Sequence, residues 1–90
     1  MIIHNEIILK GRVQGVYFRA TAKSVAESLN VKGIVKNTPE GHVWIAAEAP
    51  ADVLTEFFDW CKQGPISAEV AEWEIMEGPV QHYPDFVIGY

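Results

Sequence analysis

The sequence has 90 residues, of which 49% are hydrophobic, and this suits one small domain with a single core. Its formal net charge of −5 argues against nonspecific binding to nucleic acid or to an anionic membrane, because both attract proteins with a basic excess. One cysteine excludes an internal disulfide and is typical of a reducing compartment, so we expect a cytoplasmic protein. The N-terminus lacks the pattern of a signal peptide, and the longest apolar run is too short for a membrane span.

The first third of the chain predicts a strand, a helix and a second strand. Residues 2–9 form an apolar run in which Ile3, Ile7 and Leu9 alternate for the most part with polar residues, as in a strand with one buried face. A helical period follows from about residue 19 or 20 to residue 29, and Asn30 can end this helix in the left-handed conformation. The segment 31–36 is rich in β-branched residues and predicts the second strand.

A hairpin is predicted next. Residues 38–41, Thr-Pro-Glu-Gly, are typical of a turn, because proline presets φ at the second position and Gly41 permits a positive φ. Alternation over residues 43–47 then predicts a third strand, paired with the second.

The last part of the chain predicts a helix and two strands. The second helix begins near Pro50 and Asp52, and Gly64 followed by Pro65 ends it. Its apolar stripe consists of Val53, Leu54, Phe57, Trp60 and Cys61. Residues 70–76 and 86–90 predict the strands, but the apolar residues of the first fall on both parities, so its buried face stays undefined.

The resulting order is β-α-β-β-α-β plus a short C-terminal strand, in one domain over residues 1–90. This order is that of the ferredoxin-like α+β sandwich, an antiparallel sheet with two helices on one face. The first and third strands are central in this arrangement. The loop after the first strand can then lie near the end of the second strand.

The loop after the first strand has the composition of an anion site. Residues 11–19 read Gly-Arg-Val-Gln-Gly-Val-Tyr-Phe-Arg, so two glycines and an arginine meet the start of a helix. Free backbone N–H groups of such a loop can point at a phosphate, and the helix dipole favours negative charge there. Arg19 adds a planar cation that can hold two phosphate oxygens. Two glycines often serve only a tight turn, so the loop alone leaves both interpretations open.

Asn37 is the second candidate, at the expected end of the second strand. It can simply bond the backbone of its own turn. Alternatively, its carboxamide can orient a water molecule without placing negative charge beside a phosphate. An arginine, backbone amides and this asparagine would together form a minimal hydrolytic site.

The motif at residues 11–19, followed by Gly33-x-Val35-x-Asn37-x-x-Glu40-Gly41-x-Val43, resembles the acylphosphatase family. The resemblance extends through Gly64-Pro65 to the C-terminal Phe-x-Ile-x-Tyr, essentially the whole chain. It implies an enzyme that hydrolyses the carboxylic–phosphoric anhydride of acyl phosphates, such as acetyl phosphate or 1,3-bisphosphoglycerate, to a carboxylate and inorganic phosphate. It also implies that no metal and no organic cofactor takes part.

The resemblance assigns roles to particular residues. Arg19 corresponds to the arginine that binds the phosphoryl group, and Asn37 to the asparagine that positions the attacking water. The backbone of the loop forms the phosphate cradle, which comprises Gln14, Gly15, Val16, Tyr17, Phe18 and Arg19. The chain departs from the family pattern at Asn30, Ile34 and Glu40, where glycine, an aromatic residue and aspartate are usual. None of these departures affects Arg19 or Asn37.

Other functional classes have less support. RNA-binding domains share the βαββαβ order, but residues 2–10 contain no aromatic residue and the net charge is negative. The three histidines lack metal-ligand spacing, and Cys61 lies on an apolar helix stripe. A regulatory module that binds phosphate or acyl phosphate without turnover remains the alternative.

The expected partners follow from these interpretations. We expect a small acyl phosphate as substrate, inorganic phosphate as product and inhibitor, no nucleic acid or membrane partner, and a monomer. Two side chains near the loop have open roles: Tyr17 either contacts the acyl group or merely packs, and Lys23 either adds positive potential or is simply solvated.

Overall fold

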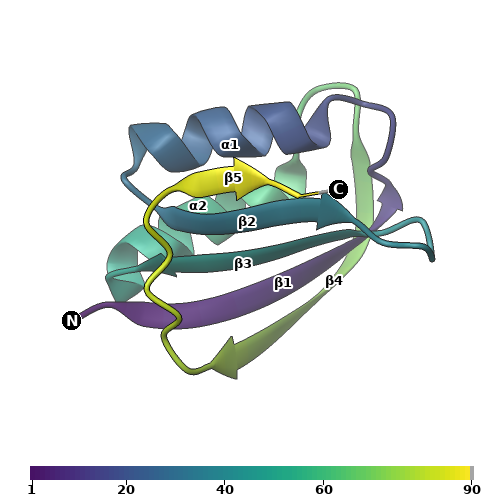
Figure 1. Cartoon of the computed structure of the whole chain (residues 1–90). Coiled ribbons are helices and arrows are strands. Elements are labelled where there is room, and N and C mark those ends of the chain that lie inside the picture. The colour runs from purple at the N-terminus through teal and green to yellow at the C-terminus, as the bar shows by residue number, and fades with distance from the viewer. Residues whose placement is uncertain (90) are drawn as a thin grey trace.

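The structure is a computed structural model and describes residues 1–89. Two helices cover one face of a five-stranded sheet, as Figure 1 shows. The elements are β1 (Ile3–Arg12), α1 (Phe18–Ser28), β2 (Lys32–Asn37), β3 (Val43–Ala49), α2 (Ala51–Gln63), β4 (Glu69–Gly78) and β5 (Phe86–Ile88).

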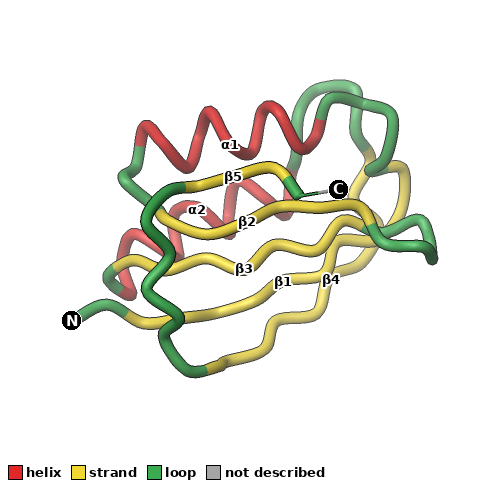
Figure 2. Tube along the Cα trace, viewed as in Figure 1, coloured by secondary structure: helices red, strands yellow, loops and turns green. Residues whose placement is uncertain are grey.

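The strand order β4-β1-β3-β2-β5 confirms the predicted ferredoxin-like α+β fold, with β1 and β3 at the centre. Neighbouring strands are antiparallel from β4 to β2, and the added terminal strand β5 runs parallel to β2, so the complete sheet is mixed. The predicted terminal strand extended to Tyr90, which lies outside the described residues. Figure 2 shows that the β1–α1 loop and the β2–β3 turn lie at the same end of the sheet.

The core lies between the sheet and the helices. Alternate residues of the central strands, such as Ile7 and Ile45, point into this core and are fully buried. Helix α1 contributes Phe18 at its start and two small residues, Ala22 and Ala26. The buried residues of α2 are Leu54, Phe57, Phe58 and Cys61. The predicted stripe missed Phe58, and its members Val53 and Trp60 are partly buried and pack against the core.

A β-bulge explains why the face of β4 was undefined in the sequence. Leu9 pairs with Trp73, but Gly11 pairs with Val70, so Ala71 is an extra residue between them. Val70 and Trp73 therefore lie on the same face despite their opposite parity. A side chain at Gly11 would lie 2.8 Å from the Ala71 backbone nitrogen, so the bulge requires glycine there.

The same pairing corrects the predicted end of the first strand. Strand β1 continues to Arg12, because the ladder with β4 resumes beyond the bulge. Gly11 therefore belongs to the strand, and the anion-type loop begins only at Val13.

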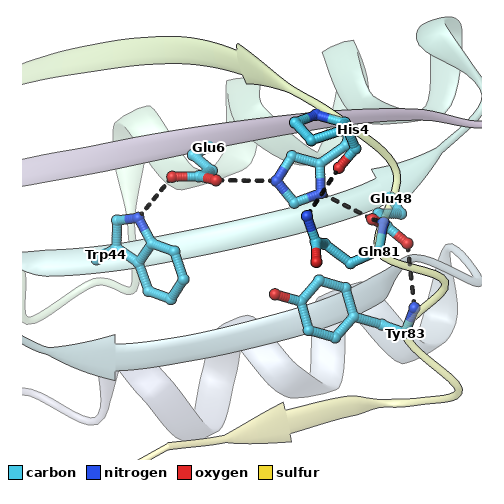
Figure 3. Close-up of polar contacts among 7 residues, drawn as sticks. His4, Glu6, Trp44, Glu48, Gln81 and Tyr83 are labelled. Atoms are coloured by element: carbon cyan, nitrogen blue, oxygen red, sulfur yellow. Dashed lines mark hydrogen bonds and ion pairs between the residues drawn. The ribbon is translucent and has the colours of Figure 1, made fainter.

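Glu48 of β3 holds the segment 79–85, which crosses the sheet face opposite the helices and leads to β5 (Figures 1 and 3). The Glu48 carboxylate is buried and accepts hydrogen bonds from the backbone N–H of Gln81 at 2.5 Å and of Tyr83 at 3.1 Å. Burial alone would raise the pKa of Glu48, but these bonds and His4 lower it below its usual value. Glu48 therefore anchors the segment as a carboxylate.

His4 of β1 lies between two carboxylates. Its Nδ1 is 2.7 Å from Glu48 Oε2, and its Nε2 is 2.9 Å from Glu6 Oε2 (Figure 3). A neutral imidazole has only one N–H group, so this geometry favours the imidazolium. Burial lowers the pKa of His4, but the hydrogen bonds to Glu6 and Glu48 outweigh it, and the pKa lies above the usual value.

We expect the contribution of His4 to stability to decrease as the solution becomes alkaline. For a group with a raised pKa, the contribution is complete below the usual value of 6.5 and is lost as the pH rises through the raised value. The reduction in unfolding free energy caused by His4→Asn should therefore be larger at about pH 6 than at about pH 10. Urea unfolding measures this difference.

A matched control is available for this experiment. His82 is exposed and has a positive φ of 60°, which asparagine tolerates well. His82→Asn should have a small effect on the unfolding free energy, because its side chain is exposed. Equal destabilisation by His4→Asn at both pH values would contradict a charged His4.

Candidate active site

A cavity of about 350 Å³ lies between the loop after β1 and the end of β2. It brings together Arg19 and Asn37, the two side chains singled out in the sequence. Among the described residues, its lining consists of Val13, Gly15, Tyr17, Phe18, Arg19, Ala20, Asn37 and Ile88. Gln14 and Val16 belong to the same loop but are not part of this lining.

The backbone of the loop has a shape suited to an anion. The sign of φ alternates along residues 14–17, since Gly15 (71°) and Tyr17 (60°) are left-handed and their preceding neighbours are not. Alternation of this kind is typical of backbone nests, in which successive N–H groups converge. Helix α1 begins directly after this loop. Among the described residues, no side chain caps the N-terminus of the helix, and its first turn contains no acidic residue. The first N–H groups of the helix therefore have no side-chain acceptor beside the cavity.

Side chains fasten this loop to the rest of the molecule. Gln14 Nε2 donates to the carbonyl oxygens of Thr38 at 2.9 Å and His42 at 2.8 Å, which joins the loop to the β2–β3 turn. Ser67 Oγ donates to the Val16 carbonyl oxygen at 3.1 Å. The Gln14 side chain thus has a structural function that the sequence did not reveal, because its acceptors are backbone groups distant along the chain.

Arg19 lies in the first turn of α1, next to a strong anchor. The preceding residue, Phe18, is buried and packs edge-on against Trp60, with ring centroids 5.6 Å apart. This contact fixes the start of the helix. The Arg19 side chain lines the cavity, and its Nη1 lies 3.4 Å from the Gly89 carbonyl oxygen, just beyond β5.

Asn37 is the last residue of β2. Its Oδ1 is buried and accepts no hydrogen bond from the described residues. The following turn does not use it, because Thr38 closes that turn by accepting from Gly41 N–H at 3.1 Å and His42 N–H at 3.2 Å. An unpaired buried acceptor costs roughly 1–3 kcal/mol, so this oxygen does not stabilise the fold.

Other candidate side chains lie outside this site. Cys61 is buried in the core, and burial raises the pKa of its thiol far above the usual value. Lys23 forms an ion pair with Glu27 at 3.6 Å along α1. Residues 1–89 contain no group of three or more His, Cys, Asp or Glu side chains that could hold a metal ion. Neither α1 nor α2 has the length and apolar character needed to cross a membrane.

The contribution of the C-terminal segment to the site could not be recognised in the sequence. Ile88 of β5 lines the cavity, and the Gly89 carbonyl oxygen accepts a hydrogen bond from Arg19, but neither residue type indicates a site. Their placement depends on the parallel pairing of β5 with β2. Only the topology brings them to the loop after β1.

The fold and the cavity together define a ferredoxin-like domain with a cavity lined by Arg19 and Asn37 at one end of its sheet. The chain belongs to the acylphosphatase family, whose sequence profile matches residues 5–88. It is 39% identical over 85 residues to the acylphosphatase of Archaeoglobus fulgidus, with 94% of this chain and 96% of the relative covered. It is 40% identical over 91 residues to that of Geotalea uraniireducens, with both chains fully covered.

A solved structure agrees with these relatives. The crystal structure of acylphosphatase from Bacillus subtilis superimposes with a TM-score of 0.94 at 34% identity and covers 100% of both chains. These similarities confirm the predicted family and the predicted enzyme class. The chain is an acylphosphatase-type hydrolase that acts on acyl phosphates.

Proposed function

We propose that this enzyme hydrolyses acyl phosphates by attack of water on phosphorus. Arg19 and the backbone N–H groups of residues 14–19 hold the phosphoryl group, and Asn37 positions the attacking water. The observation that carries the proposal is the meeting of Arg19, Asn37 and the alternating loop backbone in one cavity.

The proposed binding groups suit the negative charge that the phosphoryl oxygens carry in the transition state. Phosphoryl transfer passes through a loose transition state, in which negative charge is spread over the three equatorial oxygens. The guanidinium of Arg19 can hold two of these oxygens, and converging N–H groups at the helix N-terminus can hold the third. Because the loop is already fastened by Gln14 and Ser67, little reorganisation is needed during the reaction.

Asn37 suits the attacking water. The Asn37 carboxamide lines the cavity and can orient that water behind phosphorus, in line with the leaving carboxylate. The leaving carboxylate has a low pKa and needs no strong general acid. Among the described residues that line the cavity, none is Asp, Glu or His, so we assign the proton of the attacking water to an oxygen of the substrate phosphate.

The proposal includes several further properties. The reaction requires neither metal nor organic cofactor, inorganic phosphate is both product and competitive inhibitor, and the enzyme acts as a cytoplasmic monomer without a nucleic-acid or membrane partner.

Hydrolysis of benzoyl phosphate in the presence of EDTA tests the proposed function. We expect saturable hydrolysis, unaffected by the chelator and inhibited competitively by inorganic phosphate. A folded protein that binds phosphate but does not accelerate hydrolysis would contradict the proposal. That result would favour the alternative, a phosphate-binding regulatory module.

A further inference from the structure

We infer that the ring of Tyr17 contacts the acyl group of the substrate and makes the enzyme favour aromatic over small acyl phosphates. This inference rests on the proposed function and adds a substrate preference to it. The argument depends on how Tyr17 is held, on its exposure and on the direction of the leaving group.

The backbone of Tyr17 is firmly held at the edge of the cavity. Its carbonyl oxygen accepts hydrogen bonds from Thr21 N–H at 3.1 Å and from Thr21 Oγ1 at 2.8 Å. The next residue, Phe18, is buried in the core. The base of the Tyr17 side chain therefore has a fixed position relative to the phosphate cradle.

The ring itself is not needed for folding. The residue is 82% exposed, and no hydrogen bond joins its hydroxyl to the described residues. Its φ of 60° and ψ of 22° lie in the left-handed region, where glycine or asparagine fits better than tyrosine. Neither packing nor backbone conformation requires an aromatic residue at this position, so the ring is available to a ligand in the cavity.

In the proposed mechanism the acyl group leaves on the side of phosphorus away from Asn37. In-line displacement places the leaving acyl oxygen opposite the attacking water, which lies beside Asn37. An acyl group that extends out of the cavity meets the solvent-exposed part of its lining. Among the described lining residues, Tyr17 is the large side chain that is exposed to solvent, whereas Val13 and Phe18 are buried.

The chemistry of the ring determines the preference. A planar aromatic acyl group can stack on the phenol ring, and such contacts increase affinity by roughly three- to tenfold. An acetyl group is too small to cover the ring and gains little. The substrate class favoured is therefore an acyl phosphate with an aromatic or similarly broad apolar acyl group.

The test is the ratio of kcat/KM for benzoyl phosphate to kcat/KM for acetyl phosphate. Tyr17→Ala should lower this ratio roughly three- to tenfold, mainly through a higher KM for benzoyl phosphate. Tyr17→Phe keeps the ring and should preserve the ratio. Alanine, phenylalanine and tyrosine all disfavour the left-handed backbone conformation, so the two variants differ mainly in whether the aromatic ring is present.

The ratio separates the possible outcomes. A general defect of the loop would lower both activities by the same factor, leave the ratio unchanged and overturn the inference. If Tyr17→Ala keeps the wild-type ratio while the wild-type enzyme hydrolyses both substrates, the inference is wrong and the proposed function is still supported. A wild-type enzyme that hydrolyses neither substrate would instead contradict the proposed function.

Discussion

Arg19→Ala should lower kcat/KM for benzoyl phosphate by on the order of 10²–10³-fold or more, to the limit of detection. The guanidinium is the charged side chain in the cavity lining that can stabilise the equatorial oxygens. Among the described residues that line the cavity, its removal leaves backbone N–H groups to balance the charge of the transition state. Steady-state kinetics with benzoyl phosphate measure the effect, and inorganic phosphate should inhibit the variant more weakly.

Two further variants define what this result means. Arg12 is an exposed arginine at the end of β1, so Arg12→Ala removes the same charge outside the cavity and should retain most of the activity. Arg19→Lys keeps the charge but loses the planar pair of donors, and it should remain strongly impaired. Near wild-type kcat/KM in Arg19→Ala would show that the site is assigned wrongly.

Asn37→Ala should lower kcat by on the order of 10²-fold, with little change in inhibition by inorganic phosphate. The proposed role of Asn37 is to orient water rather than to hold the phosphoryl group. Its loss should therefore affect turnover more than binding. A large rise in the inhibition constant of phosphate, with kcat unchanged, would contradict this role.

The stability of Asn37→Ala provides a second, independent result. Because Oδ1 is buried and unpaired within the described protein, its removal should leave the free energy of unfolding unchanged or raise it slightly. Asn30→Ala is the matched control: Asn30 has a φ of 58° at the end of α1, so alanine there should destabilise by about 1 kcal/mol without lowering kcat. Asn37→Ala should thus lower activity without loss of stability, whereas Asn30→Ala should lower stability without loss of activity.

Local patterns in the sequence were sufficient to predict the fold. The period of each helix and the alternation in β1 and β3 report contacts with one core, and they depend on neighbouring residues only. The β-bulge at Ala71 could not be predicted, because it exists only through the pairing of β4 with β1. Strand β1 is longer than predicted for the same reason.

The candidate site could be predicted in part. The loop motif and Asn37 are visible because their residue types suit phosphate chemistry, and the fold brings them to one cavity. The network of His4, Glu48 and the segment 79–85 was not visible, because its members lie far apart along the chain and interact largely through backbone groups. The position of Gly89 beside Arg19 likewise depends on the topology alone.

Hydrolysis of benzoyl phosphate in ¹⁸O-labelled water tests the proposed chemistry most directly. In the proposed mechanism, water beside Asn37 attacks phosphorus, and Arg19 stabilises the phosphoryl group during the transfer. The enzyme-catalysed reaction should therefore place the label in inorganic phosphate and leave the benzoate unlabelled. Label in the benzoate carboxylate would show attack on the carbonyl carbon and would contradict the proposed roles of both residues.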